Sequence, residues 1–237
     1  MRSMLASLVV LAVSACGPQL TVVGEGNVTS VDRQVEGTKA VRLSVPGSLS
    51  VVVGEPLSLR MVAEGNLLPY LETTVAAGEL IISVRPGVSL SPTRSMSFVL
   101  TAPLLRGLAT ESSGSISAPT LVATDFKLRV ASSGSIHLAH LEAQTLDTQI
   151  LSSGEVRVDE GKVTDQTLSI QSSGNYVASG LETMTATVHS SSSGDAWVWV
   201  TDRLVATLTS SGSVRYAGGP RVTANLTSSG TVEPIAQ

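Results

Sequence analysis

The sequence predicts an all-β protein: a parallel β-helix-like solenoid with coils of about 20 residues and an N-terminal β region continuous with it. Three observations predict this fold. The tripeptide Ser-Ser-Gly occurs seven times, at spacings of 20 residues and then, twice, of 18 residues. Apolar and polar residues alternate on both sides of each tripeptide, which is typical of half-buried strands. The chain contains no amphipathic helical stretch of useful length.

Residues 1–15 have the features of a signal peptide. Arg2 supplies a positive charge, and Met4–Val13 is an apolar stretch too short to span a bilayer. The residues before Cys16, an aliphatic one and two small ones, resemble the lipobox of bacterial lipoproteins, which implies cleavage before Cys16 and its acylation. Cys16 is the only cysteine and therefore has no disulfide partner. We predict a lipid anchor at Cys16; the alternative is a plain secretory signal.

The predicted anchor also indicates where the protein resides. Two or more acyl chains give stable membrane attachment where a single chain does not. Gly17, not an aspartate, follows Cys16, and the lipobox resemblance then favours the outer membrane over the inner one. Residues 16–23 are predicted to be a short tether between this membrane and the folded part.

Residues 17–104 lack the tripeptide but still form a series of predicted strands. Short turns at Gly54-Glu55-Pro56, Gly65-Asn66 and Pro86-Gly87 separate several of them. No linker divides the mature chain, so residues 24–237 are predicted to form one solenoid domain, with regular repeats at 105–234. The predicted N-terminal strands are Leu20–Val23, Ala40–Val45, Leu49–Val53, Leu57–Val62, Leu71–Val75, Leu80–Val84 and Ser97–Thr101.

In the repeats, mostly apolar residues stand two and four positions after each glycine and four and six positions before it. This spacing places them on one side of two strands that meet at a corner. A third, looser apolar column lies seven residues after the glycine. One coil cannot bury its apolar side alone, whereas coils stacked about 4.8 Å apart share a continuous interior. The column two residues after the glycine contains Ile116, Ile136, Val156, Tyr176, Ala196, Val214 and Val232.

The tripeptide itself is predicted to form the corner. Glycine is suited to a positive φ or to close approach of another backbone segment, and both explanations are open. The serine before each glycine is predicted to form a ladder of hydroxyls hydrogen-bonded from coil to coil. A meander of hairpins would need turn signals such as Asn-Gly, which are missing. The corner residues are Ser113, Gly114, Ser133, Gly134, Ser153, Gly154, Ser173, Gly174, Ser193, Gly194, Ser211, Gly212, Ser229 and Gly230.

Short motifs along the chain resemble the putative auto-transporter adhesin, head GIN domain family of exported bacterial proteins. They occur in order, at Gly24–Val28, Val41–Gly47, Leu49–Gly54, Glu64–Glu72 and Gly78–Ile82, and the Ser-Gly steps continue them. The resemblance covers residues 24–233, although the literal tripeptide Gly-Ile-Asn is absent. It implies a β-helix-like fold and a location in the cell envelope. It implies no established activity.

The sequence offers no catalytic site. Enzymes that cleave polysaccharides need two acidic residues close together, but Asp125, Asp147 and Asp159 fall at different positions of the repeat. His140 stacks over Glu160, which we interpret as a surface contact. His137 and His189 share no column with an acid and a serine. We predict no catalytic residue.

Composition narrows the range of ligands. No metal site or cofactor motif is recognisable, since the only cysteine is the predicted anchor and no acid is fixed beside the histidines. The formal net charge is −4 and no basic cluster is present, which excludes nucleic acid as an expected partner.

Two tryptophans are the most conspicuous candidate binding residues. Trp197 and Trp199 flank the inward-facing Val198, so both are predicted to face solvent. Arg157 and Arg215 fall in the same repeat column as Trp197. Exposed indoles beside guanidinium groups stack on a sugar ring or a peptide, so we predict ligand stacking there. The alternatives are that a loop or a neighbouring subunit covers them, or that the strand alternation slips in this repeat.

These features together favour a non-catalytic cell-envelope lipoprotein, adhesin-like or a scaffold. Its β-helix would present a polar surface to a protein or polysaccharide partner. One alternative is a β-helical carbohydrate-active enzyme, and another is a purely structural or regulatory envelope component.

Overall fold

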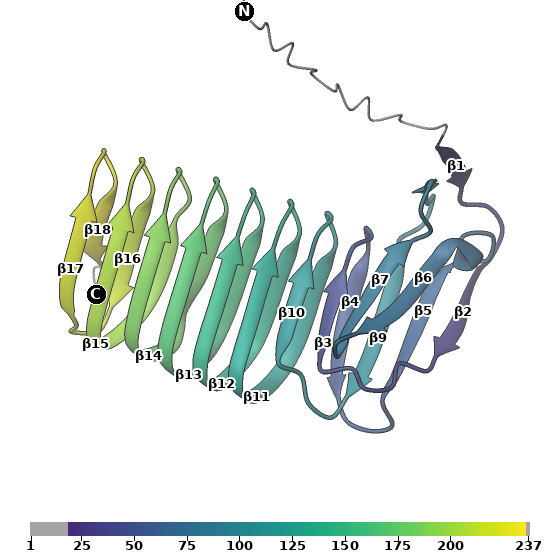
Figure 1. Ribbon diagram of the computed structural model, residues 1–237, viewed down its shortest axis with the longest axis horizontal. Helices are drawn as coiled ribbons and strands as arrows, with labels where there is room; N and C mark the ends of the chain where they lie inside the picture. Colours follow the sequence, from purple (N-terminus) through teal and green to yellow (C-terminus); the bar gives the residue numbers. More distant parts are fainter. Residues whose placement is uncertain (1–18, 236–237) are drawn as a thin grey trace, which may run out of the picture.

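The computed structural model describes residues 19–235, which form a parallel β-solenoid of about six turns. The coils stack side by side in a long row, with N-terminal strands at one end (Figure 1). The strands are β1 (Leu20–Val23), β2 (Val28–Arg33), β3 (Ala40–Leu43), β4 (Ser48–Val53), β5 (Ser58–Glu64), β6 (Leu71–Ala76), β7 (Glu79–Val84), β8 (Val88–Ser91) and β9 (Ser97–Ala102). The later strands are β10 (Gly107–Thr110), β11 (Ser115–Val130), β12 (Ser135–Ile150), β13 (Glu155–Ile170), β14 (Asn175–Ser190), β15 (Ala196–Leu208), β16 (Ser213–Ala217), β17 (Arg221–Leu226) and β18 (Thr231–Pro234).

The regular coils confirm the predicted parallel stacking. Strands β11 to β14 pair in parallel, each residue with the residue 20 positions further along, so that Ile116 faces Ile136 and Ile136 faces Val156. Ile136 and Val156 are 1% and 0% exposed. The same apolar side chains therefore stack into one interior, and the hairpin alternative is excluded for these coils.

Each coil bends twice between its corners. In β11 the alternation of buried and exposed residues is interrupted at 119–120 and again at 124–125, where two consecutive residues are exposed. Residues 119 and 124 are also the positions that the pairing with β12 skips. A coil therefore consists of three short straight segments. The loose column of the sequence, with Leu121 and Leu141, belongs to the middle segment and is buried.

The interior is mainly aliphatic but contains one polar network. Tyr176 takes a place in an apolar column, and its hydroxyl accepts a hydrogen bond from Gln166 Nε2 at 2.5 Å. Thr183 Oγ1 donates to Gln166 Oε1 at 3.0 Å. All three side chains are buried, and burial raises the pKa of the Tyr176 phenol above its usual range. Buried polar groups with partners of this kind fix the packing of neighbouring coils.

The N-terminal region continues the solenoid, in an order different from that of the chain. Strand β3 pairs in parallel with β10 and β7, and β4 pairs in parallel with β11 and β9. The β3–β4 coil therefore lies between the β7–β9 coil and the first Ser-Ser-Gly coil. Beyond it, β6 and β5 pair antiparallel with β7 and β9, and β2 pairs antiparallel with β5. These antiparallel strands cover the N-terminal end of the stack (Figure 1).

All seven strands predicted in this region are present, with ends shifted by a residue or two. Strands β2 and β8 and a short 3-10 turn at Leu68–Tyr70 were not predicted. Strand β2 is mostly exposed, so the alternating apolar pattern that reveals half-buried strands is absent from it. No helix in the described part of the chain is long and apolar enough to cross a bilayer.

Candidate functional site

The two tryptophans lie on β15, on either side of Val198. Val198 is 0% exposed, whereas Trp197 and Trp199 are half-buried. The pairing of β15 with β14 has a bulge between Ala178 and Glu182, which shortens this coil. The alternation nevertheless continues through it, since Val200 is again buried. Both indoles therefore point outward.

Arg215 covers part of this surface. Its guanidinium carbon lies 5.3 Å from the centroid of the Trp197 ring, a cation–π distance. Its Nε also lies 3.3 Å from Glu233 Oε1. We call Trp197, Trp199 and Arg215 the indole platform: an amphipathic surface with a cation held in place over one ring.

Arg157 is not part of the platform. It shares the repeat column, but Val177 of β14 stands between it and Trp197. Its Nε donates instead to Asp159 Oδ1 at 2.7 Å. The repeat count already places Arg157 two coils from Trp197 and Arg215 one coil from it, and the structure shows that only the one-coil neighbour reaches the ring.

The corner glycines are buried because the neighbouring coil is close. None of the seven has a positive φ. A Cβ atom added at Gly134 would lie 2.5 Å from the carbonyl oxygen of Gly114 and 2.6 Å from that of Ser112. Of the two explanations that the sequence left open, close backbone approach is the one that the structure shows.

The predicted hydroxyl ladder is wrong. The serines before the glycines are all exposed, and no hydrogen bond between one of them and the next occurs among the described residues. Backbone groups link the corners instead. Ser135 N donates to Gly114 O, and Glu155 N donates to Gly134 O, both at 3.1 Å. Since the backbone already provides these links, the exposed hydroxyls are left to water.

His137 has an acidic neighbour that sequence reasoning missed, whereas His140 has the one that it expected. His137 Nε2 lies 2.6 Å from Asp159 Oδ2. The His137 and Arg157 hydrogen bonds hold the pKa of the Asp159 carboxyl below its usual value. His140 lies 3.7 Å from Glu160, as expected for a surface contact, and 3.4 Å from Glu142. His189 is exposed on β14. Among the described residues, no group of three or more His, Cys, Asp or Glu side chains is arranged to hold a metal ion.

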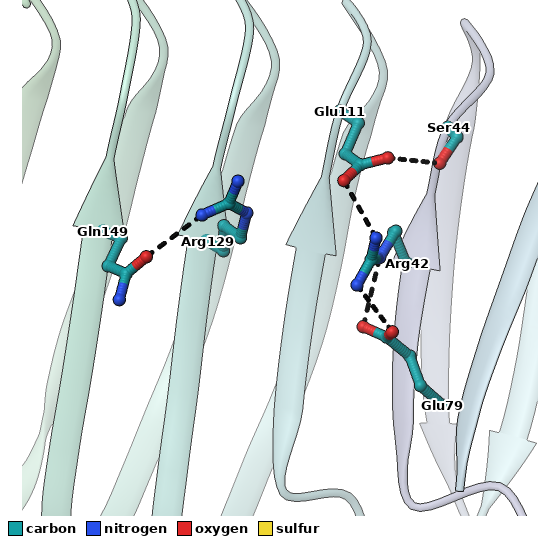
Figure 2. Close-up of polar contacts among 6 residues, drawn as sticks. All are labelled: Arg42, Ser44, Glu79, Glu111, Arg129 and Gln149. Atoms are coloured by element: carbon teal, nitrogen blue, oxygen red, sulfur yellow. Dashed lines mark hydrogen bonds and ion pairs between the residues drawn. The ribbon is translucent and has the colours of Figure 1, made fainter. Parts of the chain in front are cut away.

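A second candidate surface lies where the regular coils begin. A hollow of about 420 Å³ opens over Ala40, Gly107 and Ala109, and we call it the β10 groove. In Figure 2, Arg42 on one side points toward Glu79 and Glu111, and Arg129 on the other side points toward Gln149. Strand β10 lies between them.

Ion pairs hold the Arg42 side chain in place on one side of the groove. Arg42 Nη2 lies 2.6 Å from Glu79 Oε2, and its Nη1 lies 3.0 Å from Glu111 Oε1. Ser44 Oγ donates to Glu111 Oε2 at 3.1 Å. These residues come from β7, from β3 and from the corners after β3 and β10, so the network joins three coils.

Sequence reasoning missed the β10 groove. Its hollow exists because outward positions of β3 and β10 carry small side chains between coils that carry long ones. Gly107 pairs with Lys127, and the Cβ of Ala40 lies 3.7 Å from the position that a Cβ at Gly107 would take. The small residues can be recognised in the sequence. The long side chains that flank them cannot be assigned to the same surface from the sequence, because β3 and β7 stack in an order that differs from the chain order.

Comparison with known proteins agrees with this architecture. A family described as putative auto-transporter adhesin, head GIN domain, matches residues 39–220. The chain belongs to this family. The resemblance drawn from the sequence motifs is thereby confirmed over most of its length. No curated protein matches the chain.

Several solved structures share the fold. A putative adhesin from Bacteroides fragilis has a TM-score of 0.83 at 19% identity, over 90% of this chain and 100% of its own. A putative lipid binding protein from Parabacteroides distasonis has a TM-score of 0.75 at 22% identity, over 91% and 100%. A putative adhesin from Parabacteroides merdae has a TM-score of 0.70 at 18% identity, over 91% and 99%. At these identities the similarity shows the fold alone. The family and these neighbours are described as adhesins or lipid binding proteins, not as enzymes.

Proposed function

We propose that this chain is an exported, lipid-anchored and non-catalytic surface protein whose solenoid binds a protein or polysaccharide partner. The observation that carries the proposal is the indole platform. Trp197 and Trp199 face outward from a rigid stack of strands, and Arg215 is held over one ring. Rigid aromatic side chains with a polar edge are typical of surfaces that bind sugars and peptides, because little conformational freedom is lost on binding.

The sequence supports the location. Membership of an adhesin family fits an exported cell-surface protein. The anchor residue, Cys16, lies outside the described residues, and its acylation is part of the proposal. The small residue after it favours the outer membrane.

The pairing of Asp159 supports a non-catalytic role over the carbohydrate-active alternative. Asp159 is held by His137 and Arg157, which keep the pKa of its carboxyl below the usual value. Carboxylates paired with cations stay ionised, whereas glycoside hydrolysis requires one carboxyl group that carries a proton. Release of new reducing ends from a polysaccharide incubated with the protein would favour the enzyme instead.

The test uses cells that express the full chain. In the double variant Trp197→Ser/Trp199→Ser we expect attachment to glycan arrays or to partner cells to fall at least tenfold. The matched control is Val122→Ser, which removes an exposed apolar side chain elsewhere on the coils (56% exposed) and should leave attachment unchanged. Unaltered attachment in the tryptophan variant would contradict a binding role for the platform and favour the purely structural or regulatory alternative.

The same cells test the anchor. Cys16→Ala should release the protein from the membrane fraction and abolish incorporation of labelled palmitate. If the variant stayed in the membrane fraction and still incorporated palmitate, lipid anchoring at this residue would be contradicted.

A further inference from the structure

Three cations lie on neighbouring coils along the β10 groove. The backbone N–H of Arg106 donates to Lys39 O at 2.7 Å, and that of Lys127 donates to Arg106 O at 3.0 Å. These bonds place the three residues on neighbouring coils: Lys39 and Arg106 directly precede β3 and β10, and Lys127 lies on β11, in register with Gly107. All three side chains are exposed. Arg129, half-buried on β11, adds a fourth positive charge to the lining.

These cations have no acidic partner. Within the described part of the chain, Lys39, Arg106, Lys127 and Arg129 form no ion pair within 4.0 Å. Most other arginines do, as the following residues show: Arg42, Arg60, Arg85, Arg157, Arg215 and Arg221. Like charges on neighbouring coils repel each other, and Asp147, the residue of β12 in register with Lys127, forms no ion pair with it within 4.0 Å. A bound anion would relieve that repulsion.

The floor of the groove is apolar and open. Ala40, Gly107 and Ala109 provide no long side chains, and the hollow of about 420 Å³ lies within the size range of small-ligand sites. An anion with a flat, partly apolar body fits such a site. The sugar ring of a uronic acid has this shape: its C–H face packs on methyl groups while its carboxylate reaches a cation.

The acids of the groove restrict what can approach. Asp125 and Asp147 line its β11–β12 end, and Glu79, neutralised by Arg42, lines the other. A broad anionic surface such as a lipid bilayer would meet these carboxylates as well as the cations. A narrow polymer that follows the row from Lys39 to Lys127 meets the cations and reaches Asp147 only on the next coil.

We propose that the β10 groove binds the carboxylates of an acidic polysaccharide, one uronate unit to each cation of the row formed by Lys39, Arg106 and Lys127. This inference rests on the proposed binding function and adds to it a second site and a ligand class. The groove is formed by strand segments that precede the corner glycine, whereas the tryptophans of the indole platform follow it, so the two are separate sites.

The test measures binding of a galacturonate hexamer by calorimetry, with maltohexaose as the neutral probe. The triple variant Lys39→Gln/Arg106→Gln/Lys127→Gln should weaken hexamer binding at least tenfold. The control triple variant Arg33→Gln/Arg94→Gln/Arg203→Gln removes the same charge from exposed positions outside the groove and should change binding less than twofold. Binding should also weaken as salt rises, because the contacts are between exposed charges.

A second variant separates shape from charge. Ala109→Leu keeps every cation and fills the hollow, so it should weaken hexamer binding several-fold; a thermal melt checks that the variant is folded. The site would be refuted by equal losses in the two triple variants or by equal affinity for maltohexaose. Binding of phosphatidylglycerol vesicles but not of the hexamer would identify a lipid surface as the ligand and refute the polysaccharide.

The outcome is distinguishable from failure of the proposed function. If the tryptophan variant loses attachment while the groove variants bind as the wild type does, only the groove is refuted. If neither surface affects binding of any probe, the binding function itself is refuted.

Discussion

At the corner glycines, backbone oxygens of the preceding coil occupy the space beside the Cα atom. The side of each corner that faces its neighbour has no room for a methyl group, whatever the backbone angles. This explains why a residue with no side chain recurs at a fixed interval. It also explains why serine, which faces water, needs only to be small and polar there.

Gly134→Ala tests this packing. The added Cβ would meet three oxygen atoms within 2.7 Å, two of them in the backbone, so the corner must shift. We expect a loss of about 1–3 kcal/mol in the free energy of unfolding, measured by chemical denaturation. Gly219→Ala is the control, since nothing lies within 4 Å of its Cβ position. Equal stability of the two variants would contradict the close-approach explanation.

A second residue-scale feature is the Asp159 carboxylate. Its pKa is lowered by His137 first and then by Arg157, so folding favours the ionised form. The stabilisation is therefore present above the ordinary carboxyl pKa of 3.8 and is lost as the pH falls through the lower, folded value.

His137→Gln should raise the pKa of Asp159 toward that ordinary value. The measurement is an NMR titration of the Asp159 carboxyl carbon in the wild type and the variant. His189→Gln, on an exposed position of another coil, serves as control and should leave the titration unchanged. An identical Asp159 midpoint in all three proteins would show that the His137 contact does not form in solution.

At the scale of elements, the coils are nearly interchangeable. Strands β11, β12 and β13 each have 16 residues and pair in the same register. Each coil contacts only the coils before and after it, so stability is expected to be close to a sum of coil and interface terms. Where the interval falls to 18 residues, the bulge in β14–β15 absorbs the difference at a bend and leaves the corner in line.

Deletion of residues 135–154 should therefore give a folded protein. It removes one coil and places β13 directly on β11, with inward columns and corners still aligned. We expect a β-type circular dichroism spectrum and a cooperative thermal transition. Deletion of only 135–144 is the control; it puts corners opposite strands and should unfold or aggregate. A folded half-coil deletion would contradict the requirement for register.

At the scale of the whole molecule, a parallel stack of strands has two open ends, and exposed strand edges promote pairing with other chains. Here the N-terminal end carries antiparallel strands β5 and β6, with β2 outside β5. At the other end, β17 is exposed along its whole described length. The N-terminal coils therefore differ in role from the repeats, because they begin the stack and their antiparallel strands also cover its N-terminal end.

This arrangement also determines where the candidate sites lie. The β10 groove forms at the junction between the capped N-terminal coils and the first repeats, where small outward residues interrupt rows of long ones. The indole platform forms near the other end, in the shortened coil. Both sites therefore occur where the repeat departs from its regular form, while the regular middle coils carry paired polar side chains.

The sequence by itself determined the repeat, and with it the parallel coils, the aliphatic interior, the outward direction of Trp197 and Trp199, and the family. Strict periodicity is sufficient for these predictions, because each residue of a solenoid stacks on the equivalent residue of the next repeat. The contacts can therefore be predicted from the repeat alone, without knowing how distant segments fold. Only the tertiary structure showed that the guanidinium of Arg215 lies over the ring of Trp197, and that no hydrogen bond links the described corner serines from coil to coil. It also revealed the β10 groove. These outcomes depend on which coils are neighbours and on how closely their backbones approach. The sequence does not reveal the neighbours of β3, β7 and β10, because these strands stack in an order that differs from their order in the chain.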